Sequence, residues 1–393
     1  MIIVSLIVLT LAGATLITLR AVQSNLTGQV GGNFEDHAES VGQFVGLFLY
    51  SNANKVQVLS QSHSLHASTA ERNASYQGSE TQILAELQAL DQRWQEAPDN
   101  DPLILSITFR KNTADTVDPV HVQTAGRTLA DFLDLFEEHS EVFLTDRYGG
   151  TIAATGRLSD YYQADELWWQ AAWNNGDGAV YISDPQHDES AGVTALLIAV
   201  PVFDHDTGSV IGVLRSTLNV DGLLGLIAGT TFGEFGYAAI LDSNGTAIVD
   251  PSGRAIEAIQ FLPREQQEQL IAPGTGYNVS SDTIFGHATI SSPRPLPDSR
   301  TEQEVAALQA VSNLHWTVVT QQDASEAFST SSVIKRVAWV AGTIAAVVAA
   351  IAAIIIAQAM TRPLKRLSVA ACQIAKARWT CRCHARAGTR SAG

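Results

Sequence analysis

The chain has two long apolar runs, one near each end. Ile2–Leu19 and Val337–Met360 contain no charged side chain, and a helix needs about 20 mostly apolar residues to cross the hydrocarbon core of a bilayer. Both runs therefore predict transmembrane helices. A cleaved signal peptide is the alternative for the first run, but that run lacks a basic n-region and a clean small-x-small cleavage site. We favour an uncleaved anchor.

The segment after the first apolar run is patterned as helices, and we assign 20–98 to stalk and packing helices. Apolar residues recur at helical spacing in Val41, Phe44, Val45 and Phe48, which predicts a long helix that rises from the membrane. A second helical face carries Ile83, Leu84, Leu87, Leu90 and Trp94. It ends before Pro98 and the turn Asp99-Asn100-Asp101-Pro102.

From about Ile104 the pattern changes to short β-like runs separated by turn residues. The first predicted strand is Leu103–Phe109. The next two form a predicted hairpin, because Val142–Thr145 and Thr151–Ala154 flank the turn residues Asp146-Arg147-Tyr148-Gly149-Gly150. Further strands are predicted at Ala179–Ile182, Ala195–Val202 and Val210–Leu218.

The same hairpin phrase returns about a hundred residues later, where Ala238–Leu241 leads into Asp242-Ser243-Asn244-Gly245 and then Thr246–Asp250. The second copy continues with candidate strands at Gly276–Val279, Ile284–Ile290 and Trp316–Thr320. An internal repeat explains both copies. We therefore expect an α+β fold with two tandem modules, each an antiparallel sheet with flanking helices, at 99–224 and 225–332.

Charge sets the expected orientation of the chain. Lysine and arginine gather on the cytoplasmic side of membrane proteins, and basic residues crowd just after the second apolar run, at Arg362, Lys365, Arg366, Lys376 and Arg378. The central region is therefore expected outside the cytoplasm, in a two-pass protein of the plasma membrane. The formal net charge of −16 argues against a nucleic-acid partner, because phosphate binding needs a basic face.

All three cysteines, Cys372, Cys381 and Cys383, follow the second apolar run. The central region therefore has no disulfide framework. Cys381-x-Cys383-His384 supplies too few ligands for a zinc site, which needs four at a recognised spacing. We expect no metal site and no cofactor.

A series of short motifs runs in one order along the first module. The motifs are Asp146-Arg147-x-Gly149-Gly150-Thr151-Ile152-Ala153-Ala154-Thr155, Tyr161-Tyr162, Trp168-Trp169, Val180-Tyr181-Ile182-Ser183-Asp184-Pro185, Pro201-Val202-Phe203 and Ile211-Gly212-Val213. Together they resemble the double Cache (dCache) sensor regions of bacterial and archaeal chemoreceptors and sensor histidine kinases. The similarity covers roughly Thr27–Ser332. It implies two PAS-like modules, a small-molecule ligand in the membrane-distal module, and a homodimer.

A second resemblance begins where the second apolar run ends. The phrase Thr361-Arg362-Pro363-Leu364-Lys365-Arg366-Leu367 is similar to the opening of a HAMP linker, and Leu364, Leu367, Ala371 and Ile374 follow the 3-4-3 spacing of a helix seam. The likeness ends after Ala377. We interpret 361–377 as a partial HAMP linker and 378–393 as an aberrant tail, for which a frameshift in the gene is one hypothesis. A cytoplasmic signalling partner would then carry the output.

The Cache resemblance also implies a ligand site. Modules that bind amino acids carry a motif in which four residues separate a tyrosine from an arginine, and one residue separates that arginine from a Trp-Tyr pair. The matching positions here are Tyr161, Glu166, Trp168 and Trp169. A glutamate thus replaces the arginine that would grip a ligand carboxylate, and Thr217 replaces an acid expected at the end of the last strand. A neutral or cationic ligand is therefore favoured over a plain amino acid. Aromatic side chains would enclose an amine by cation–π attraction, with acids as counter-charge, so the predicted ligand-binding residues are Tyr161, Glu166, Trp168, Trp169, Tyr181, Asp184 and Asp188.

Alternatives stay open at this point. Trp168 and Trp169 could simply pack on the sheet, although adjacent helix residues are not expected to face one core together, which makes Trp169 the better pocket residue. The acids of 184–189 could hold calcium, but no recognised calcium-loop spacing is present.

Three function classes are considered. A sensor without a catalytic domain is favoured. A membrane-tethered exported enzyme lacks support, because the sequence has no Gly-x-Ser-x-Gly elbow, no His-Glu-x-x-His and no phosphate loop. A truncated product that does not signal is the third possibility.

Overall fold

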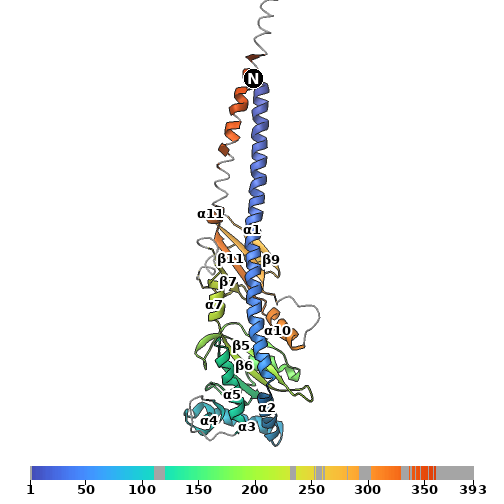
Figure 1. Cartoon of the computed structure of the whole chain (residues 1–393), viewed down its shortest axis with the longest axis vertical. Coiled ribbons are helices and arrows are strands. Elements are labelled where there is room, and N and C mark those ends of the chain that lie inside the picture. The colour runs from blue at the N-terminus through green and yellow to red at the C-terminus, as the bar shows by residue number, and fades with distance from the viewer. Residues whose placement is uncertain are drawn as a thin grey trace, which may run out of the picture. The chain divides into compact units, whose positions relative to one another are not determined.

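A computed structural model of the chain describes residues 2–109, 120–230, 236–251, 262–280, 282–291 and 302–328, together with 253, 259 and separate residues between 336 and 359. The chain divides into two units, of which the first comprises Met1–Gln29 with Phe328–Gly393 and the second is Val30–Ala327. Both sheets belong to the second unit (Figure 1).

Eleven helical segments are described. They are α1 (Ile2–Ser60), α2 (His63–Ser75), α3 (Glu80–Glu96), α4 (Pro102–Ile107), α5 (Val120–Leu135), α6 (Leu167–Trp173), the 3-10 turn η1 (Asn174–Gly176), α7 (Asp221–Ala228), α9 (Arg264–Leu270), α10 (Glu302–Asn313) and α11 (Ala324–Ala327). Among the described residues, no helix combines the length and the apolar character that a membrane crossing requires. The anchors at 2–19 and 337–360 stay predictions. The partial HAMP linker, the tail and the three cysteines lie outside the described residues.

Two antiparallel sheets confirm the mixed helix and sheet architecture. The first contains β1 (His139–Asp146), β2 (Thr151–Ala154), β3 (Tyr181–Ile182), β4 (Gln186–Asp188), β5 (Val193–Phe203) and β6 (Val210–Asn219). Its order is β2-β1-β6-β5-β3, and β4 also pairs with β5. The second contains β7 (Tyr237–Leu241), β8 (Ala247–Val249), β9 (Thr275–Val279), β10 (Thr283–Thr289) and β11 (Thr317–Asp323). Its order is β8-β7-β11-β10-β9, which repeats the topology of the first sheet.

The two hairpins that suggested a repeat in the sequence have the same local chemistry. Asp146 Oδ1 accepts hydrogen bonds from the backbone nitrogens of Tyr148 at 2.8 Å and Gly150 at 3.0 Å. Asp242 Oδ1 does the same for Asn244 at 2.8 Å and Thr246 at 2.7 Å. An aspartate at the end of the first strand thus closes each turn onto its own backbone.

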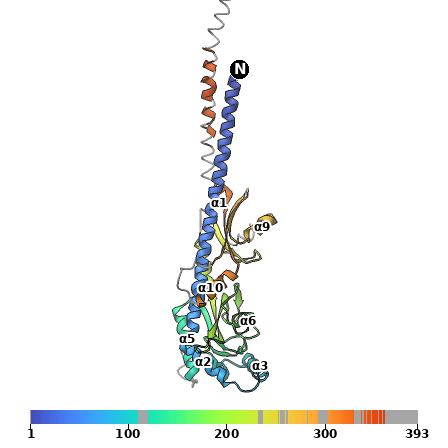
Figure 2. The same ribbon diagram turned by 90° about the vertical axis from the view of Figure 1, so that its right-hand side faces the viewer.

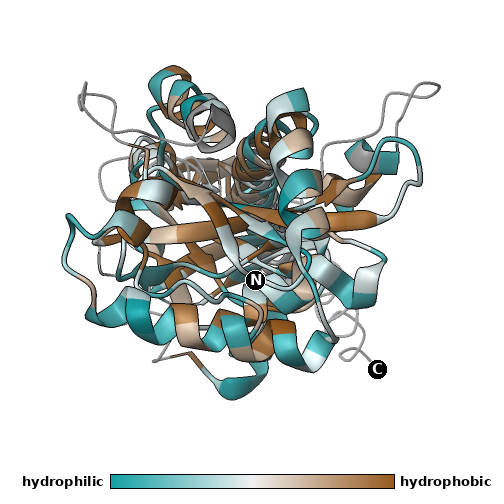
Figure 3. Ribbon diagram, turned by 90° about the horizontal axis from the view of Figure 1, so that it is seen from below, coloured by the Kyte–Doolittle hydropathy of each residue, from teal (hydrophilic) through white to brown (hydrophobic). Residues whose placement is uncertain are grey.

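Helices cover both faces of the first sheet. Side chains of a strand alternate between the two faces, and those of Val142, Leu144 and Leu214 pack in one core with residues of α1 and α5. Phe143 and Val213 point the other way and pack with residues of α3, α4 and α6. Figure 2 shows α1 and α5 on one side of this sheet and α3 and α6 on the other. In Figure 3 the hydrophobic colour gathers on the strands between the helices.

The segment Leu103–Phe109 is not the strand that its apolar run predicted. Most of it forms α4, because Pro102 occupies the first helical turn and the side chain of Asp101 caps the helix by accepting a hydrogen bond from Leu103 N at 2.8 Å. Ile104 is fully buried in the resulting contact. A cap of this kind fixes a helix start that an apolar run of seven residues does not reveal.

The helix α1 packs closely against the second sheet. An added Cβ on Gly286 of β10 would lie 2.1 Å from the carbonyl oxygen of Phe34 in α1. The hydroxyl of Thr320 in β11 donates a hydrogen bond to the same oxygen at 2.9 Å. Only a residue without a side chain fits between the strand and the helix.

Gly286→Ala should therefore lower the free energy of unfolding by about 1–3 kcal/mol, because the extra methyl group has no space. Chemical unfolding of the chain measures this change. Gly225→Ala in α7 is the matched control: a Cβ there meets nothing within 4 Å, and alanine favours a helix interior by about 1 kcal/mol over glycine. Equal changes in the free energy of unfolding of the two variants would contradict the close packing.

Candidate ligand-binding site

Charged and polar side chains lie on one face of the first sheet, where an apolar core is expected. The strand register pairs Phe143 of β1 with Arg215 of β6, and Glu141 with Thr217. Residues that are paired across a sheet share a face, so all four point toward the side that carries α6. Glu141, Arg215 and Thr217 are 4%, 8% and 0% exposed. Buried charges need partners.

Asp188 is the partner of Arg215. The short strand β4 pairs with β5 and brings the Asp188 carboxylate into an ion pair with the guanidinium of Arg215. Thr217 Oγ1 donates a further hydrogen bond to this carboxylate at 3.0 Å, and the backbone nitrogens of Ser190 and Ala191 donate to it at 3.1 Å each. Burial opposes the charge of Asp188, but Arg215 and these donors hold its pKa below the ordinary value.

Glu141 lies beside this pair without a cation of its own. Among the described residues it makes no ion pair, and its Oε2 accepts a hydrogen bond from Ser190 Oγ at 2.7 Å. The same hydroxyl lies 2.8 Å from Asp188 Oδ1, and a serine hydroxyl has a single proton to donate. Burial, reinforced by the negative charge of Asp188, raises the pKa of Glu141 to about 7. The cluster thus contains two carboxylates and one guanidinium.

Aromatic rings enclose the guanidinium of Arg215. Its carbon lies 5.0 Å from the centre of the Phe143 ring and 5.3 Å from that of Trp168, and these two rings meet edge to face at 5.5 Å. Cations are attracted to aromatic faces at such distances. Arg215 Nε is buried and has no hydrogen-bond partner among the described residues. One donor in the middle of this face therefore remains available.

Tyr181 belongs to the same face. It pairs with Ala199 of β5, and Ala199 pairs with Arg215. The row Phe143, Arg215, Ala199, Tyr181 therefore crosses the sheet with all four side chains on one side. The small side chain of Ala199 separates the guanidinium from the phenol. Burial, together with the charge of Asp184, raises the pKa of Tyr181.

Four of the seven predicted residues thus gather around Arg215. Trp168, Tyr181 and Asp188 are part of the cluster, and the exposed Glu166, which precedes α6, acts on Arg215 through its charge. Arg215 and Glu141 were not predicted. Their signal in the sequence is a charged residue at an inward position of an otherwise apolar strand, which the period of two in Val210–Leu218 would have exposed.

The expectation that the two adjacent tryptophans would not face one core together is wrong. Both are buried, Trp168 at 4% and Trp169 at 5% exposure. Trp169 Nε1 donates a hydrogen bond to Thr145 Oγ1 at 2.9 Å, and its ring stacks on Trp173 at 5.3 Å. The short helix α6 presents both indoles to β1, because Phe143 and Thr145 are two residues apart on the same face. These contacts pack Trp169 against β1 and Trp173.

Tyr161 shares the hydrophobic core of Phe143 and Trp168, but its hydroxyl bonds to α2. Its hydroxyl accepts a hydrogen bond from Arg72 at 3.2 Å, and burial raises the pKa of that hydroxyl to about 12. It lines a cavity of about 500 Å³ between α2, α3 and α4, whose other polar residues include Arg72, Glu71 and Glu86. The resemblance predicted Tyr161 in one ligand site with Trp168 and Trp169, and the three residues share one hydrophobic core.

Asp184 also has a separate role. This exposed aspartate accepts a hydrogen bond at 2.6 Å from Nε1 of Trp316, which directly precedes β11 of the second sheet. Since Asp184 bonds to Trp316 and Asp188 to Arg215, these two acids are turned toward protein partners and not toward a common calcium ion. The described residues contain no group of three side chains arranged to hold a metal.

The pKa of Glu141 predicts a pH dependence of stability. Between its ordinary pKa of 4.5 and about 7, the folded chain holds a proton that the unfolded chain has lost. The free energy of unfolding therefore falls as the pH rises through this window, by about 3 kcal/mol from this group. Glu141→Gln should remove that contribution. The free energy of unfolding of the variant minus that of the original chain should therefore be larger at about pH 8 than at about pH 5.

Thermal unfolding at the two pH values measures this difference. His139, whose pKa burial lowers to about 4, acts in the opposite sense and is present in both chains. Glu137→Gln is the control, because Glu137 is exposed and lies four residues before Glu141. Parallel pH profiles of Glu141→Gln and the original chain would contradict the assignment.

Comparison with known proteins identifies the family. A family model described as a Cache domain, dCache_1, matches residues 50–331, which confirms the resemblance inferred from the motifs. No curated protein matches the chain.

Three solved structures are similar at low identity. The ligand-binding domain of the Pseudomonas fluorescens chemoreceptor CtaA in complex with L-leucine is 14% identical with a TM-score of 0.46, over 78% of this chain and 99% of that one. The ligand-binding domain of the Pseudomonas aeruginosa chemoreceptor PctB with L-arginine is 16% identical with a TM-score of 0.44, over 77% of this chain and 98% of that one. The extracellular domain of vpHK1S-Z8, described as a histidine kinase, is 12% identical with a TM-score of 0.48, over 78% of this chain and 99% of that one. At this level of similarity, the ligands of these proteins are not assigned to the present chain. The family match, which spans most of the sequence, shows that the chain belongs to the dCache_1 family of Cache domains.

Proposed function

We propose that the chain is a membrane-bound extracytoplasmic sensor, which binds a small molecule in its first module and transmits a signal through the second apolar run to a HAMP-like segment. The observation that carries this proposal is the charge of the buried cluster. Glu141 and Asp188 share a single guanidinium, that of Arg215. When Glu141 ionises, one buried negative charge has no positive partner among the residues that the structure describes.

The cluster favours an organic cation as the ligand. An ammonium group near Glu141 would supply the missing charge, and Trp168 and Tyr181 would face it with their aromatic rings. A ligand carboxylate finds less support, because Asp188 already occupies Arg215. CtaA and PctB bind amino acids in their crystal structures, whereas the Glu166 position argues for a different class of ligand here.

A hydrogen bond supports transmission from the first module to the second. Asp184 lies between β3 and β4, four residues before Asp188, and it accepts from Trp316 Nε1 at 2.6 Å. From Trp316 the chain continues through β11 into α11 (Ala324–Ala327), toward the second apolar run. A ligand that moves Asp188 would therefore move the acceptor of Trp316. A homodimer and a cytoplasmic signalling partner remain part of the proposal.

A screen of primary amines, each with its matched alcohol and carboxylic acid, tests the ligand class. An amine that binds should raise the melting temperature of the full chain, because a ligand at 100 times its Kd adds about 2.7 kcal/mol of stability. Glu141→Gln should lose this response, and Glu137→Gln should keep it. The proposal is wrong about the ligand if acids or alcohols stabilise the chain as well as amines, or if every amine that stabilises the original chain stabilises Glu141→Gln to the same extent.

A second pair of variants tests the link to the second module. Asp184→Ala leaves the buried Trp316 indole without its acceptor and should cost about 1–3 kcal/mol of stability, whereas Asp184→Asn keeps an acceptor oxygen. Hydrogen exchange of β11 should change on ligand binding in Asp184→Asn but not in Asp184→Ala. An unchanged response in Asp184→Ala would place transmission elsewhere.

A further inference from the structure

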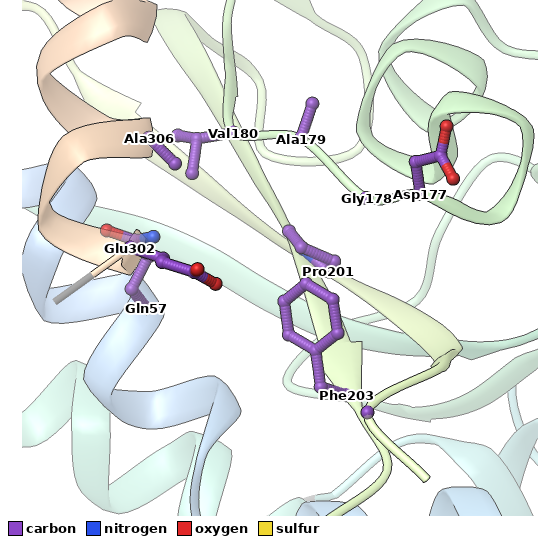
Figure 4. A pocket seen from close by; sticks show the side chains of 10 residues that line it. Gln57, Asp177, Gly178, Ala179, Val180, Pro201, Phe203, Glu302 and Ala306 are labelled. Atoms are coloured by element: carbon purple, nitrogen blue, oxygen red, sulfur yellow. The ribbon is translucent and has the colours of Figure 1, made fainter.

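A second cavity lies where the first sheet meets α10 of the second module. It measures about 600 Å³, within the usual range of ligand pockets. Its walls come from α1, from the segment before β3, from β5 and its turn to β6, and from α10, as Figure 4 shows. The lining residues are Gln57, Asp177, Gly178, Ala179, Val180, Pro201, Phe203, Gly208, Glu302 and Ala306.

The floor of this junction cavity is apolar. Pro201 and Phe203 of β5 form it together with Val180. Gly178 has a φ of +76°, and a Cβ there would lie 2.9–3.0 Å from side-chain atoms of Val210, Phe203 and Pro201. The backbone therefore lies directly on the ring and shapes the cavity wall.

The charged side chains among the described lining residues are both acidic. Asp177 and Glu302 lie on opposite walls, as Figure 4 shows, and the part of the lining that the structure describes includes no lysine, arginine or histidine. Such a cavity attracts a cation, and its apolar floor suits a hydrocarbon body. The ring of Phe203 adds a surface on which an ammonium group can rest.

We propose that the junction cavity binds an organic cation with an apolar body, separately from the cluster around Arg215. The occupant would bridge the two modules. The segment 177–180 leads straight into β3 and Asp184, and α10 ends three residues before Trp316. Both walls thus converge on the hydrogen bond between Asp184 and Trp316, so an occupant regulates how firmly the modules are joined.

Titration of the full chain with phenethylamine, followed by calorimetry, tests this proposal. Phenethyl alcohol and phenylacetate are the matched neutral and anionic probes. The double variant Asp177→Asn/Glu302→Gln should weaken binding of the amine about tenfold, since each carboxylate contributes up to about 1 kcal/mol at a partly exposed site. The pair Asp131→Asn/Glu137→Gln removes the same net charge from exposed positions outside the cavity and should leave the Kd unchanged.

Glu141→Gln separates this site from the cluster around Arg215. Phenethylamine should bind that variant at the junction cavity as tightly as it binds the original chain. The inference is overturned if phenethylamine does not bind, if the alcohol or the acid binds equally well, or if the Asp177/Glu302 variant keeps the original Kd. Loss of binding in Glu141→Gln alone would assign the amine to the first cluster instead.

Discussion

The ion pair between Arg215 and Asp188 is the constraint around which the first module is organised. A buried guanidinium in the middle of a sheet face is tolerated only with a close partner, and removal of one member of such a pair typically costs about 3–5 kcal/mol. The strand β4, only three residues long, supplies that partner. Its position, the course of the loop after β3 and the environment of Glu141 all follow from the need to neutralise Arg215.

The second sheet repeats the topology without the charge. On its corresponding face, Tyr237 donates a hydrogen bond to Gln321 at 2.7 Å, and burial lowers the pKa of His287 and so favours its neutral form. Leu241, Phe285 and Val319 fill the rest of the core there. The two modules thus share a backbone plan, while among the described residues only the first has an ion pair on the equivalent face. This difference supports the proposal that the first module binds the ligand.

Local chemistry explains what could be predicted from the sequence. The aspartate of each hairpin closes its turn within five residues, and the helical face of Ile83, Leu87 and Trp94 is buried as its spacing indicates. The error at α4 is local, because the cap by the adjacent Asp101 overrides an apolar run. The other errors arise where segments distant in the sequence meet, as where α6 lies across β1 and buries both Trp168 and Trp169. The ion pair of Arg215 could not be predicted from the sequence, because its partner, Asp188, lies 27 residues away and becomes a neighbour only when β4 and β6 flank β5.

One unbroken helix supplies part of the core of both sheets. In α1, Phe34 meets β10 of the second sheet, while Ala53 and Val56 are fully buried in the same core as strands of the first. The modules are therefore not interchangeable cassettes. A chimera that exchanges ligand specificity with another Cache protein would have to carry over the matching stretch of this helix, and its junctions would lie inside the helix instead of at the boundary between the sheets.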